Sequence, residues 1–272
     1  MIPPAANSAW VIGGAGFLGS ALAERCRAAG QRVLVVDPAG EPGELTLRAA
    51  ADAPGALAHA AALLAPQVIF FCAATRGGDA AAYRRTYVEP VLRAVEAAPQ
   101  AHLVFCSSSA VYGGSGAVTE QSPTPGETAR QRALLEGESA VLRAGGAVAR
   151  LVALYGPGRC ELLRRHLAGE PRLPGAPDRV LNYVHVQDAA CALALLAGES
   201  GVYNVCAESF TKTEVYAMLE AVTGIPQSPR DAAATERRGT ADHRVSAELL
   251  RAVTAWAPQL SFRSFVAASL HS

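Results

Sequence analysis

The sequence predicts an α/β fold, in which a doubly wound parallel sheet carries helices on both faces and is followed by a small C-terminal lobe. Short apolar runs alternate with stretches of helical periodicity over the first 150 residues, in the order βαβ(β)αβαβ. These runs are apolar throughout, as in parallel strands that are buried on both faces. After about residue 155 the chain instead mixes Gly, Pro and Arg around short helices. With 272 residues, half of them apolar, the chain is long enough for a core and a smaller lobe.

Turn residues, helix caps and a proline locate the strands and helices of the first half. AWVIGG is a buried strand that runs into a glycine turn, and FLGSALAERCRAAG is a helix that closes at Gly30. QRVLVVD, QVIFFCAAT and AHLVFCSSS are the next strands. AYRRTYVEPVLRAVEAA is a helix that bends or restarts near Pro90, and residues 125–143 form a later amphipathic helix.

The second half carries weaker signals. In GVYNVCAESFTKTEVYAMLEAVTGIP a strand leads into a helix capped by Thr211 or Ser209, with Glu214 placed for a capping box. We expect Asp188 to cap the helix AACALALLA. QSPRDAAATERRGTADHRVSAELLRA begins without periodicity, so it predicts a surface loop or lid followed by a terminal helix.

The motif GGAGFLG follows the first strand and opens the first helix. Gly13, Gly16 and Gly19 would provide a tight turn, a backbone that can approach a pyrophosphate, and a helix N-terminus that favours the anion. Asp37 ends the next strand, 18 residues after Gly19, where a carboxylate can bond both hydroxyls of an adenosine ribose. The alternative is that the three glycines only allow the helix to pack closely on the strand and bind no ligand. The context favours a Rossmann-type dinucleotide site.

The Asp37 carboxylate also favours NAD over NADP. It would repel a 2′-phosphate, and the next basic residue along the chain is Arg48. Asp52 is a further candidate for an adenine contact, although a loop or N-cap role fits it equally well. The predicted cofactor-binding residues are Gly13, Gly16, Phe17, Leu18, Gly19, Asp37, Asp52 and Ala73.

A second motif, FCSSSAVYGG at residues 105–114, runs from a strand into a polar turn. Ligands of a parallel sheet bind beyond the carboxyl ends of its strands, so hydroxyl groups placed there face the cofactor's crevice. The candidates are Ser107, Ser108, Ser109 and Tyr112.

Together with VLVVD, LYGPG and NYVHVQDAA, these motifs resemble the extended or atypical short-chain dehydrogenase/reductase superfamily, in its NAD-dependent epimerase/dehydratase branch, over roughly residues 8–225. The resemblance implies one unit, 1–272, with a dinucleotide-binding core at about 8–154. The part at about 155–272 would be mainly a substrate lobe with returning core elements. Ser108, four positions before Tyr112, would orient the substrate hydroxyl; the alternative is that it only terminates the strand.

The catalytic Tyr of this branch, followed four residues later by a Lys, is absent. Lys212 is the only lysine, and Glu208 stands four residues before it. Aligning the helix by its LLEGE end places Thr128 and Arg132 at the two positions. Threonine holds its proton too tightly to replace the phenol, and arginine could anchor an anion but not relay protons.

If the protein is an enzyme, we therefore expect a displaced phenol, or a group of the substrate itself, to supply the acid–base function. The candidates are Tyr112 and Tyr87, the second standing where the branch keeps an Asn that holds a water. Core packing is the alternative for Tyr87, and His185 is expected to be structural. Cys106, inside a strand, is expected to be a buried and inert thiol.

The expected substrate contacts are Ser109, Arg132 and Arg159. Further arginines of the second half could meet a phosphate or carboxylate, or simply form a solvated helix face: Arg164, Arg165 and Arg172. Ala153 replaces an Asn that the resemblance would place against a nucleotide sugar, so we expect a hydroxylated small molecule without naming its class.

Charge and cysteine content exclude several classes. Lys+Arg equals Asp+Glu at 24 each, so no long-range field would attract nucleic acid or an anionic membrane. The six cysteines form no CxxC pair, so we expect no metal site and no disulfide framework. The start lacks a basic region before an apolar stretch, and the longest apolar run, residues 56–75, is interrupted. We expect a cytoplasmic protein.

Three functions fit the sequence. The first is an NAD-dependent epimerase, dehydratase or reductase with a non-standard acid–base arrangement. The second is a dinucleotide- or partner-binding protein that has lost turnover. The third is a redox-neutral lyase or cyclase. As the resemblance implies, helices at 80–98 and 127–144 would pair with a second copy in a four-helix bundle.

Overall fold

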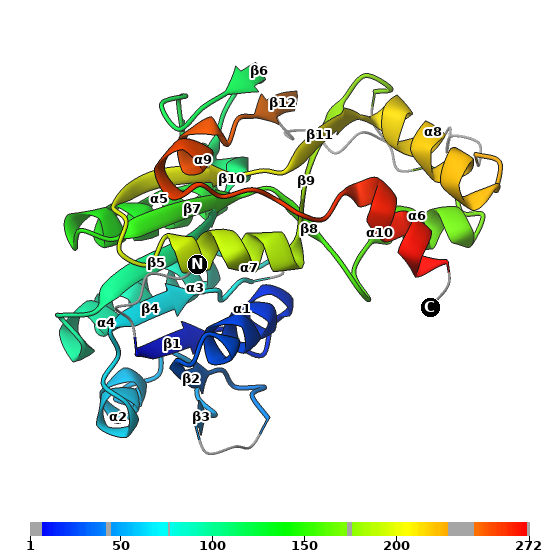
Figure 1. Ribbon diagram of the computed structural model, residues 1–272. Helices are drawn as coiled ribbons and strands as arrows, with labels where there is room; N and C mark the ends of the chain where they lie inside the picture. The colour runs from blue at the N-terminus through cyan, green and yellow to red at the C-terminus, as the bar shows by residue number, and fades with distance from the viewer. Residues whose placement is uncertain (1–6, 42–44, 76, 173–175, 228–241, 271–272) are drawn as a thin grey trace.

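The computed structural model describes residues 7–41, 45–75, 77–172, 176–227 and 242–270. Its main sheet has seven strands in the order β10-β7-β5-β4-β1-β2-β3, and every neighbouring pair is parallel (Figure 1). The strands are β1 (Ser8–Ile12), β2 (Arg32–Val36), β3 (Thr46–Leu47), β4 (Val68–Phe71), β5 (His102–Ser108), β7 (Ala147–Leu151) and β10 (Gly201–Val205). The predicted doubly wound parallel sheet is confirmed.

Both faces of the sheet are buried, because alternate residues of each strand enter different apolar clusters. In β1, Ala9 and Val11 join one cluster, while Trp10 and Ile12 join the other. The first cluster contains side chains of α1 (Phe17–Ala28), α7 (Val186–Leu195) and α9 (Glu248–Thr254). The second contains side chains of α2 (Ala56–Leu63), α3 (Ala80–Tyr87), α4 (Glu89–Ala97) and α5 (Ala129–Arg143).

The predicted break near Pro90 is confirmed, since α3 ends at Tyr87 and α4 restarts with Pro90 in its first turn. The helix within residues 125–143 is α5. Thr128 caps it in a reciprocal capping box with Gln131, which explains why the helix begins there.

A smaller lobe stands beside the carboxyl edge of the sheet. It contains the three-stranded sheet β11-β9-β8, and Figure 1 shows α6, α8 and α10 grouped around it. A third apolar cluster holds it together, with ring contacts among Tyr155, Tyr183 and Phe262. The elements are β8 (Ala153–Tyr155), α6 (Glu161–Leu167), β9 (Val180–His185), β11 (Glu208–Thr211), α8 (Lys212–Thr223) and α10 (Phe262–Ser269).

Of the two helix caps predicted in the second half, one is confirmed and one is wrong. Thr211 caps α8 in a capping box with Glu214, as predicted. Asp188 is not a cap: His185 caps α7, because its Nδ1 accepts the Gln187 amide hydrogen. The buried Asp188 carboxylate instead accepts the amide hydrogens of Gln259 and Leu260 and ties the C-terminal segment to α7.

A strand also appears where only loop and helix were expected. β12 (Asp242–Val245) pairs in parallel with β6 (Ser115–Val118), and α9 follows as the expected helix. The predicted loop at 228–241 lies outside the described residues. Within the described ranges, no helix combines the length and the apolar character needed to cross a membrane.

Candidate functional site

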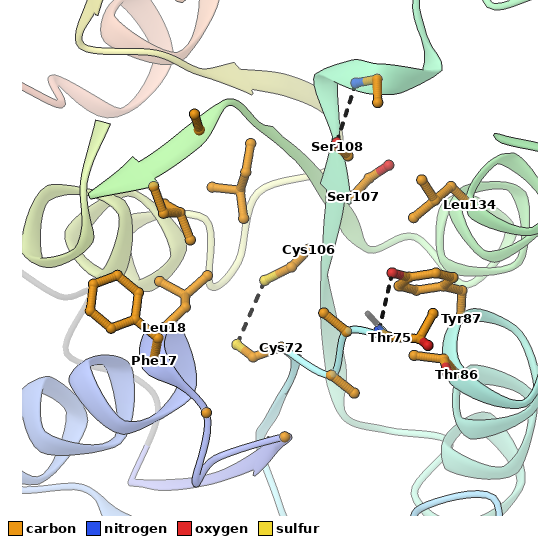
Figure 2. A pocket seen from close by; sticks show the side chains of 18 of the residues that line it. Phe17, Leu18, Cys72, Thr75, Thr86, Tyr87, Cys106, Ser107, Ser108 and Leu134 are labelled. Carbon is orange, nitrogen blue, oxygen red and sulfur yellow. Dashed lines mark hydrogen bonds between the residues drawn. The ribbon is translucent and has the colours of Figure 1, made fainter. Parts of the chain in front are cut away.

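The site is a cleft of about 1550 Å³ along the carboxyl edge of the main sheet. It extends from the glycine turn after β1, across the ends of β4 and β5, to β9 and β12 of the second half. Helices α3 and α5 form part of its wall (Figure 2). This is the edge at which parallel α/β sheets bind their ligands.

The glycine turn has no room for side chains at two of its three predicted positions. A Cβ on Gly19 would lie 2.2 Å from the Gly13 carbonyl oxygen, and one on Gly13 would lie 2.5 Å from the Ala73 nitrogen. Gly13 also has a φ of 76°, which favours glycine. A Cβ on Gly16 would meet only the Gly13 oxygen, at 3.3 Å, so space within the protein does not by itself require glycine there.

The end of α1 beside this turn is suited to an anion. Gly16 is the N-cap and provides no side-chain partner for the free N–H groups of the first turn. Phe17 and Leu18 continue the lining of the cleft from this turn, and Ala73 lines it from the end of β4.

Asp37 links the end of β2 to the glycine turn. Its carboxylate accepts the Ala15 amide hydrogen at 3.1 Å and the Ala39 amide hydrogen at 2.8 Å, and the residue lines the cleft. Asp52 lines the same end of the cleft. It does not cap α2, whose N-cap is Gly55, so the N-cap alternative is excluded.

The three serines after Cys106 differ in their roles. Ser107 is buried and donates to the Glu138 carboxylate of α5. Ser108 ends β5, and its Oγ accepts the Ala110 amide hydrogen at 3.2 Å, which starts a short 3₁₀ turn at Ser109–Val111. Ser108 and Ser109 both line the cleft and are only partly buried, so a ligand can reach them.

The alignment of α5 that used its LLEGE end is wrong by two residues. The residues of α5 that line the cleft are Arg130, Gln131 and Leu134. Thr128 is the cap of the helix, and Arg132 points its guanidinium to the carbonyls of Gly126 and Glu127. The positions that face the cleft at the Tyr-to-Lys spacing are therefore Arg130 and Leu134, and the predicted substrate contact of Arg132 is not formed at this cleft.

A signal in the sequence could have given this register. Gly137 packs so closely on α3 that a Cβ would lie 2.4 Å from the Tyr87 carbonyl oxygen. Glu138 is buried and binds Arg150 of β7, with Nη2 to Oε2 at 2.7 Å. Because this Gly–Glu pair must face the sheet, the residues four and eight positions before Glu138, Leu134 and Arg130, fall on the cleft side.

Tyr112 belongs to a buried polar network beneath the cleft. Its hydroxyl donates to Asn204 Oδ1 at 2.6 Å and accepts from Arg150 Nη1 at 3.1 Å. Burial raises the pKa of Tyr112, against the opposing effect of Arg150. The residue is 1% exposed, and its hydroxyl already has both an acceptor and a donor.

Tyr87 lies on the other face of the sheet. Figure 2 shows its hydroxyl beside Thr75, with Leu134 nearby, while Cys106 points to the opposite side of β5. The hydroxyl accepts only a long hydrogen bond from the Thr75 amide, at 3.4 Å, and no acceptor for its own proton occurs in the described part of the chain. The ring also stacks on Tyr83.

Two thiols meet in the floor of the cleft. Cys72 and Cys106, on neighbouring strand ends, have their sulfurs 3.6 Å apart (Figure 2). The contact with Cys72, followed by burial, raises the pKa of Cys106 well above its ordinary value. Cys106 is thus a buried thiol, but it is not remote from the site. Across the described residues, no group of three or more His, Cys, Asp or Glu side chains could hold a metal ion.

The arginines of the second half have separate positions. Arg159 lines the cleft, with its guanidinium 5.0 Å from the centre of the Phe17 ring. Arg164 and Arg165 form ion pairs with Glu161 and Glu170 on an exposed helix face. Arg172 binds Gln227 and lies over the Tyr216 ring. Of these, only Arg159 keeps the role of a candidate ligand contact.

Several lining residues were not singled out in the sequence, and besides Arg130 three of them carry basic side chains. Arg85 reaches the cleft from α3, Arg179 from the start of β9, and His243 from β12. His243 is buried, its ring contacts Tyr112 edge-on, and burial lowers its pKa. No local motif marks these residues, since their place depends on the pairing of distant segments.

Solved structures with the same fold include several enzymes. MoeE5 in complex with UDP-glucuronic acid and NAD is 25% identical, with a TM-score of 0.84 and 96% of each chain covered. The UDP-glucose 4-epimerase of Thermus thermophilus in complex with NAD is 24% identical, with a TM-score of 0.82 over 97% of this chain and 98% of the other. The dTDP-glucose 4,6-dehydratase of Bacillus anthracis in complex with NAD is 19% identical, with a TM-score of 0.82 over 97% and 95%.

The last two structures show the fold alone at this level of identity. No curated protein gives a significant match to the sequence. A model of the NAD dependent epimerase/dehydratase family matches residues 9–206, which include the glycine turn, Asp37, the serine turn and α5. The chain belongs to the NAD-dependent epimerase/dehydratase family.

Proposed function

We propose that the protein binds NAD along the glycine turn and acts on a hydroxylated small molecule, as an epimerase, dehydratase or reductase with an unusual acid–base group. The observation that carries this proposal is the glycine cradle with Asp37 beside it. MoeE5, a relative in fold and sequence, is bound to NAD and UDP-glucuronic acid, which supports the same pairing of cofactor and polar substrate.

The residues present fit a dinucleotide. Side chains at Gly13 and Gly19 would collide with backbone, and the absence of a side chain at Gly16 leaves the uncapped N–H groups of α1 open to a pyrophosphate. Asp37 would meet the ribose hydroxyls and disfavour a 2′-phosphate, so we propose NAD rather than NADP. When bound, NAD would supply the two-electron acceptor for oxidation of a carbinol.

For the chain's own chemistry, we propose that Ser108 orients the reacting hydroxyl and that Tyr87 exchanges its proton. Ser108 is accessible from the cleft, and its Oγ can still donate. Tyr87 and Tyr112 both line the cleft and are 3% and 1% exposed, but the proton of Tyr87 has no acceptor among the described residues. Tyr112 is the weaker candidate, because its hydroxyl is already engaged by Asn204 and Arg150.

The test is conversion of a panel of hydroxylated compounds in the presence of NAD, with NAD affinity measured in parallel. Products are followed by NMR and mass spectrometry as well as by NADH absorbance, because epimerisation and dehydration leave no net NADH. We expect Tyr87→Phe and Ser108→Ala to lower kcat by about 100-fold or more, with unchanged NAD affinity. Tyr83→Phe is the matched control, since Tyr83 stacks on Tyr87 without lining the cleft. Full activity of Tyr87→Phe would remove it from the mechanism.

A second candidate is a dinucleotide-binding protein without turnover. It is favoured by one observation, the apolar and buried Leu134 at the cleft position where a lysine would stand. NAD binding without NADH formation and without conversion of any compound of the panel would support this second candidate.

We also propose a homodimer through α3, α4 and α5. Helices α3 and α4 pack against α5, and Leu92 of α4 and Leu142 of α5 remain 40% and 38% exposed. Burial of these leucines in a bundle would stabilise the pair. Light scattering that finds a strict monomer at micromolar concentration would contradict this.

We also propose a cytoplasmic location. It is supported by the six cysteines, which are all described and all free of disulfides.

A further inference from the structure

The charged residues of the cleft are unevenly distributed. The acidic residues among those lining it are Asp37 and Asp52, both at the end beside the glycine turn. The remaining charged lining residues are four arginines, Arg85, Arg130, Arg159 and Arg179. The part of the cleft beyond the predicted cofactor site is therefore strongly cationic.

These four guanidinium groups have no ion-pair partner among the described residues. Among the described arginines outside the cleft, some pair with carboxylates, as Arg150 with Glu138 and Arg164 with Glu161 and Glu170. Others bind backbone carbonyls instead, as Arg132 does. Even Arg84, which precedes Arg85, pairs with Glu136 and Glu89. Among the described residues, no carboxylate neutralises the arginines of the cleft, and the buried Nε of Arg179 has no hydrogen-bond partner there.

Two of the four lie at the reacting end proposed above. Gln131 Nε2 donates to the Ala110 carbonyl at 2.8 Å, which fixes the first turn of α5 against the turn that follows Ser108. Arg130 precedes Gln131 and lines the cleft. Arg85 lines it from α3, two residues before Tyr87, and α3 packs against α5.

We propose that the reacting part of the substrate carries an anionic oxygen group, a carboxylate or a phosphate, which Arg130 and Arg85 bind. This inference rests on the proposed function and adds the substrate class. A guanidinium presents two parallel N–H donors to such a group and stays charged at any relevant pH. Arg130 faces the cleft at the position where the family pattern has a phenol. In this proposal it binds and orients the substrate anion and does not transfer a proton.

The experiment compares probes that differ in the anionic group alone. UDP-glucuronate and UDP-glucose differ by a carboxylate on the sugar, and glucose 6-phosphate and glucose differ by a phosphate. Each is titrated calorimetrically into the protein with and without NAD. We expect the acidic member of at least one pair to bind about tenfold tighter or more, and the pair that shows the effect distinguishes carboxylate from phosphate.

Variants locate the effect. Arg130→Gln and Arg85→Gln should each remove most of the preference for the acidic probe, while affinity for NAD and for the neutral probe is retained. Arg143→Gln is the matched control, because Arg143 is an exposed arginine of the same helix that contacts Ser139 outside the cleft. The preference should also weaken as salt is raised.

Equal binding of both members in each pair, no detectable binding of either acidic probe at millimolar concentration, or a preference unchanged in Arg130→Gln and Arg85→Gln would overturn the inference. The proposed function fails separately, if NAD itself does not bind. NAD binding without any preference for the acidic probes would leave the cofactor assignment standing and reject only the anionic substrate.

Discussion

The glycine turn after β1 and the first turn of α5 line the same cleft, yet they differ in how closely they keep the family's pattern. At the glycine turn, Gly13 and Gly19 have backbone atoms within 2.5 Å of where a Cβ would be. At α5, the cleft positions are Arg130 and Leu134, although the helix, its cap and its buried Glu138 are all in place. The helix and its packing are present in the second region, while Arg130 and Leu134 stand where the resemblance to the family predicts a Tyr and a Lys.

This difference separates two properties. Cofactor binding depends on backbone shape and one carboxylate, and any side chain at the two tight glycines would destroy that shape. Proton transfer depends on side chains that project into the cleft from α5, and these can change without disturbing the packing beneath them. A protein of this fold can therefore keep its dinucleotide site and alter its chemistry.

The largest expected effect comes from the packing beneath α5. Arg150→Met would leave the Glu138 carboxylate buried without its charge partner, which should lower the free energy of unfolding by about 3–5 kcal/mol. Urea denaturation measures this change. Replacing the pair together, as Arg150→Met with Glu138→Leu, should recover much of the loss. A stability equal to wild type in the single variant would show that the pair does not hold α5 in place.

A smaller loss of stability, joined to loss of cofactor, is expected at the glycine turn. Gly19→Ala forces a Cβ to within 2.2 Å of the Gly13 oxygen and should cost about 2–3 kcal/mol while abolishing NAD binding. Gly16→Ala should fold with near-normal stability and still bind NAD poorly, because its methyl group would occupy the ligand's approach. If both variants bind NAD normally, the turn is not the pyrophosphate site.

Removal of the α5 cap should cost about 1 kcal/mol. Thr128→Ala removes the acceptor for the Gln131 amide and half of the capping box, and the expected loss appears in thermal unfolding. Thr128→Ser keeps the cap and serves as the control. NAD affinity should be the same in all three proteins. Loss of NAD binding in Thr128→Ala but not in Thr128→Ser would contradict this expectation, because it would show that the glycine turn depends on the first turn of α5.

The smallest effect concerns pH. Burial lowers the pKa of His185, whose Nδ1 must be unprotonated to cap α7. The unfolded chain therefore takes up the proton first as pH falls below about 6.5, and this contribution to stability is lost between that value and the lower folded-state pKa. His185→Asn, which can also cap, should show a shallower fall in stability from pH 7 to 5. If stability falls equally steeply with pH in His185→Asn and wild type, His185 is not a source of this pH dependence.

Much of the fold followed from the sequence because its signals are local. The glycine spacing, the apolar strands, the break at Pro90 and the Thr211 capping box depend on residues near one another, and all appear as expected. The failures involve distant partners. Asp188 was expected to cap the nearest helix, but it binds the amides of Gln259 and Leu260, about seventy positions away.

The register of α5 failed for a related reason. Two residues of an α-helix span about 200°, so Thr128 and Arg132 lie on the opposite side of α5 from Arg130 and Leu134. Alignment by the LLEGE end alone did not establish which of these sides faces the sheet. The contacts that do so, Gly137 on α3 and Glu138 on Arg150, come from other elements. Arg85, Arg179 and His243 were missed because the strand pairing and helix packing that bring them to one cleft have no local signature.

The most direct test that the glycine turn and Asp37 form a cofactor site is calorimetric titration of the protein with NAD and NADP, after a spectroscopic check that no cofactor has co-purified. We expect NAD to bind more tightly than NADP, and Asp37→Ala to weaken NAD about tenfold or more. Asp37→Asn serves to separate the charge from the acceptor of the Ala15 amide hydrogen. Binding of neither dinucleotide, or NAD binding that is unchanged in Asp37→Ala, would contradict the assignment of this edge of the sheet as a cofactor site.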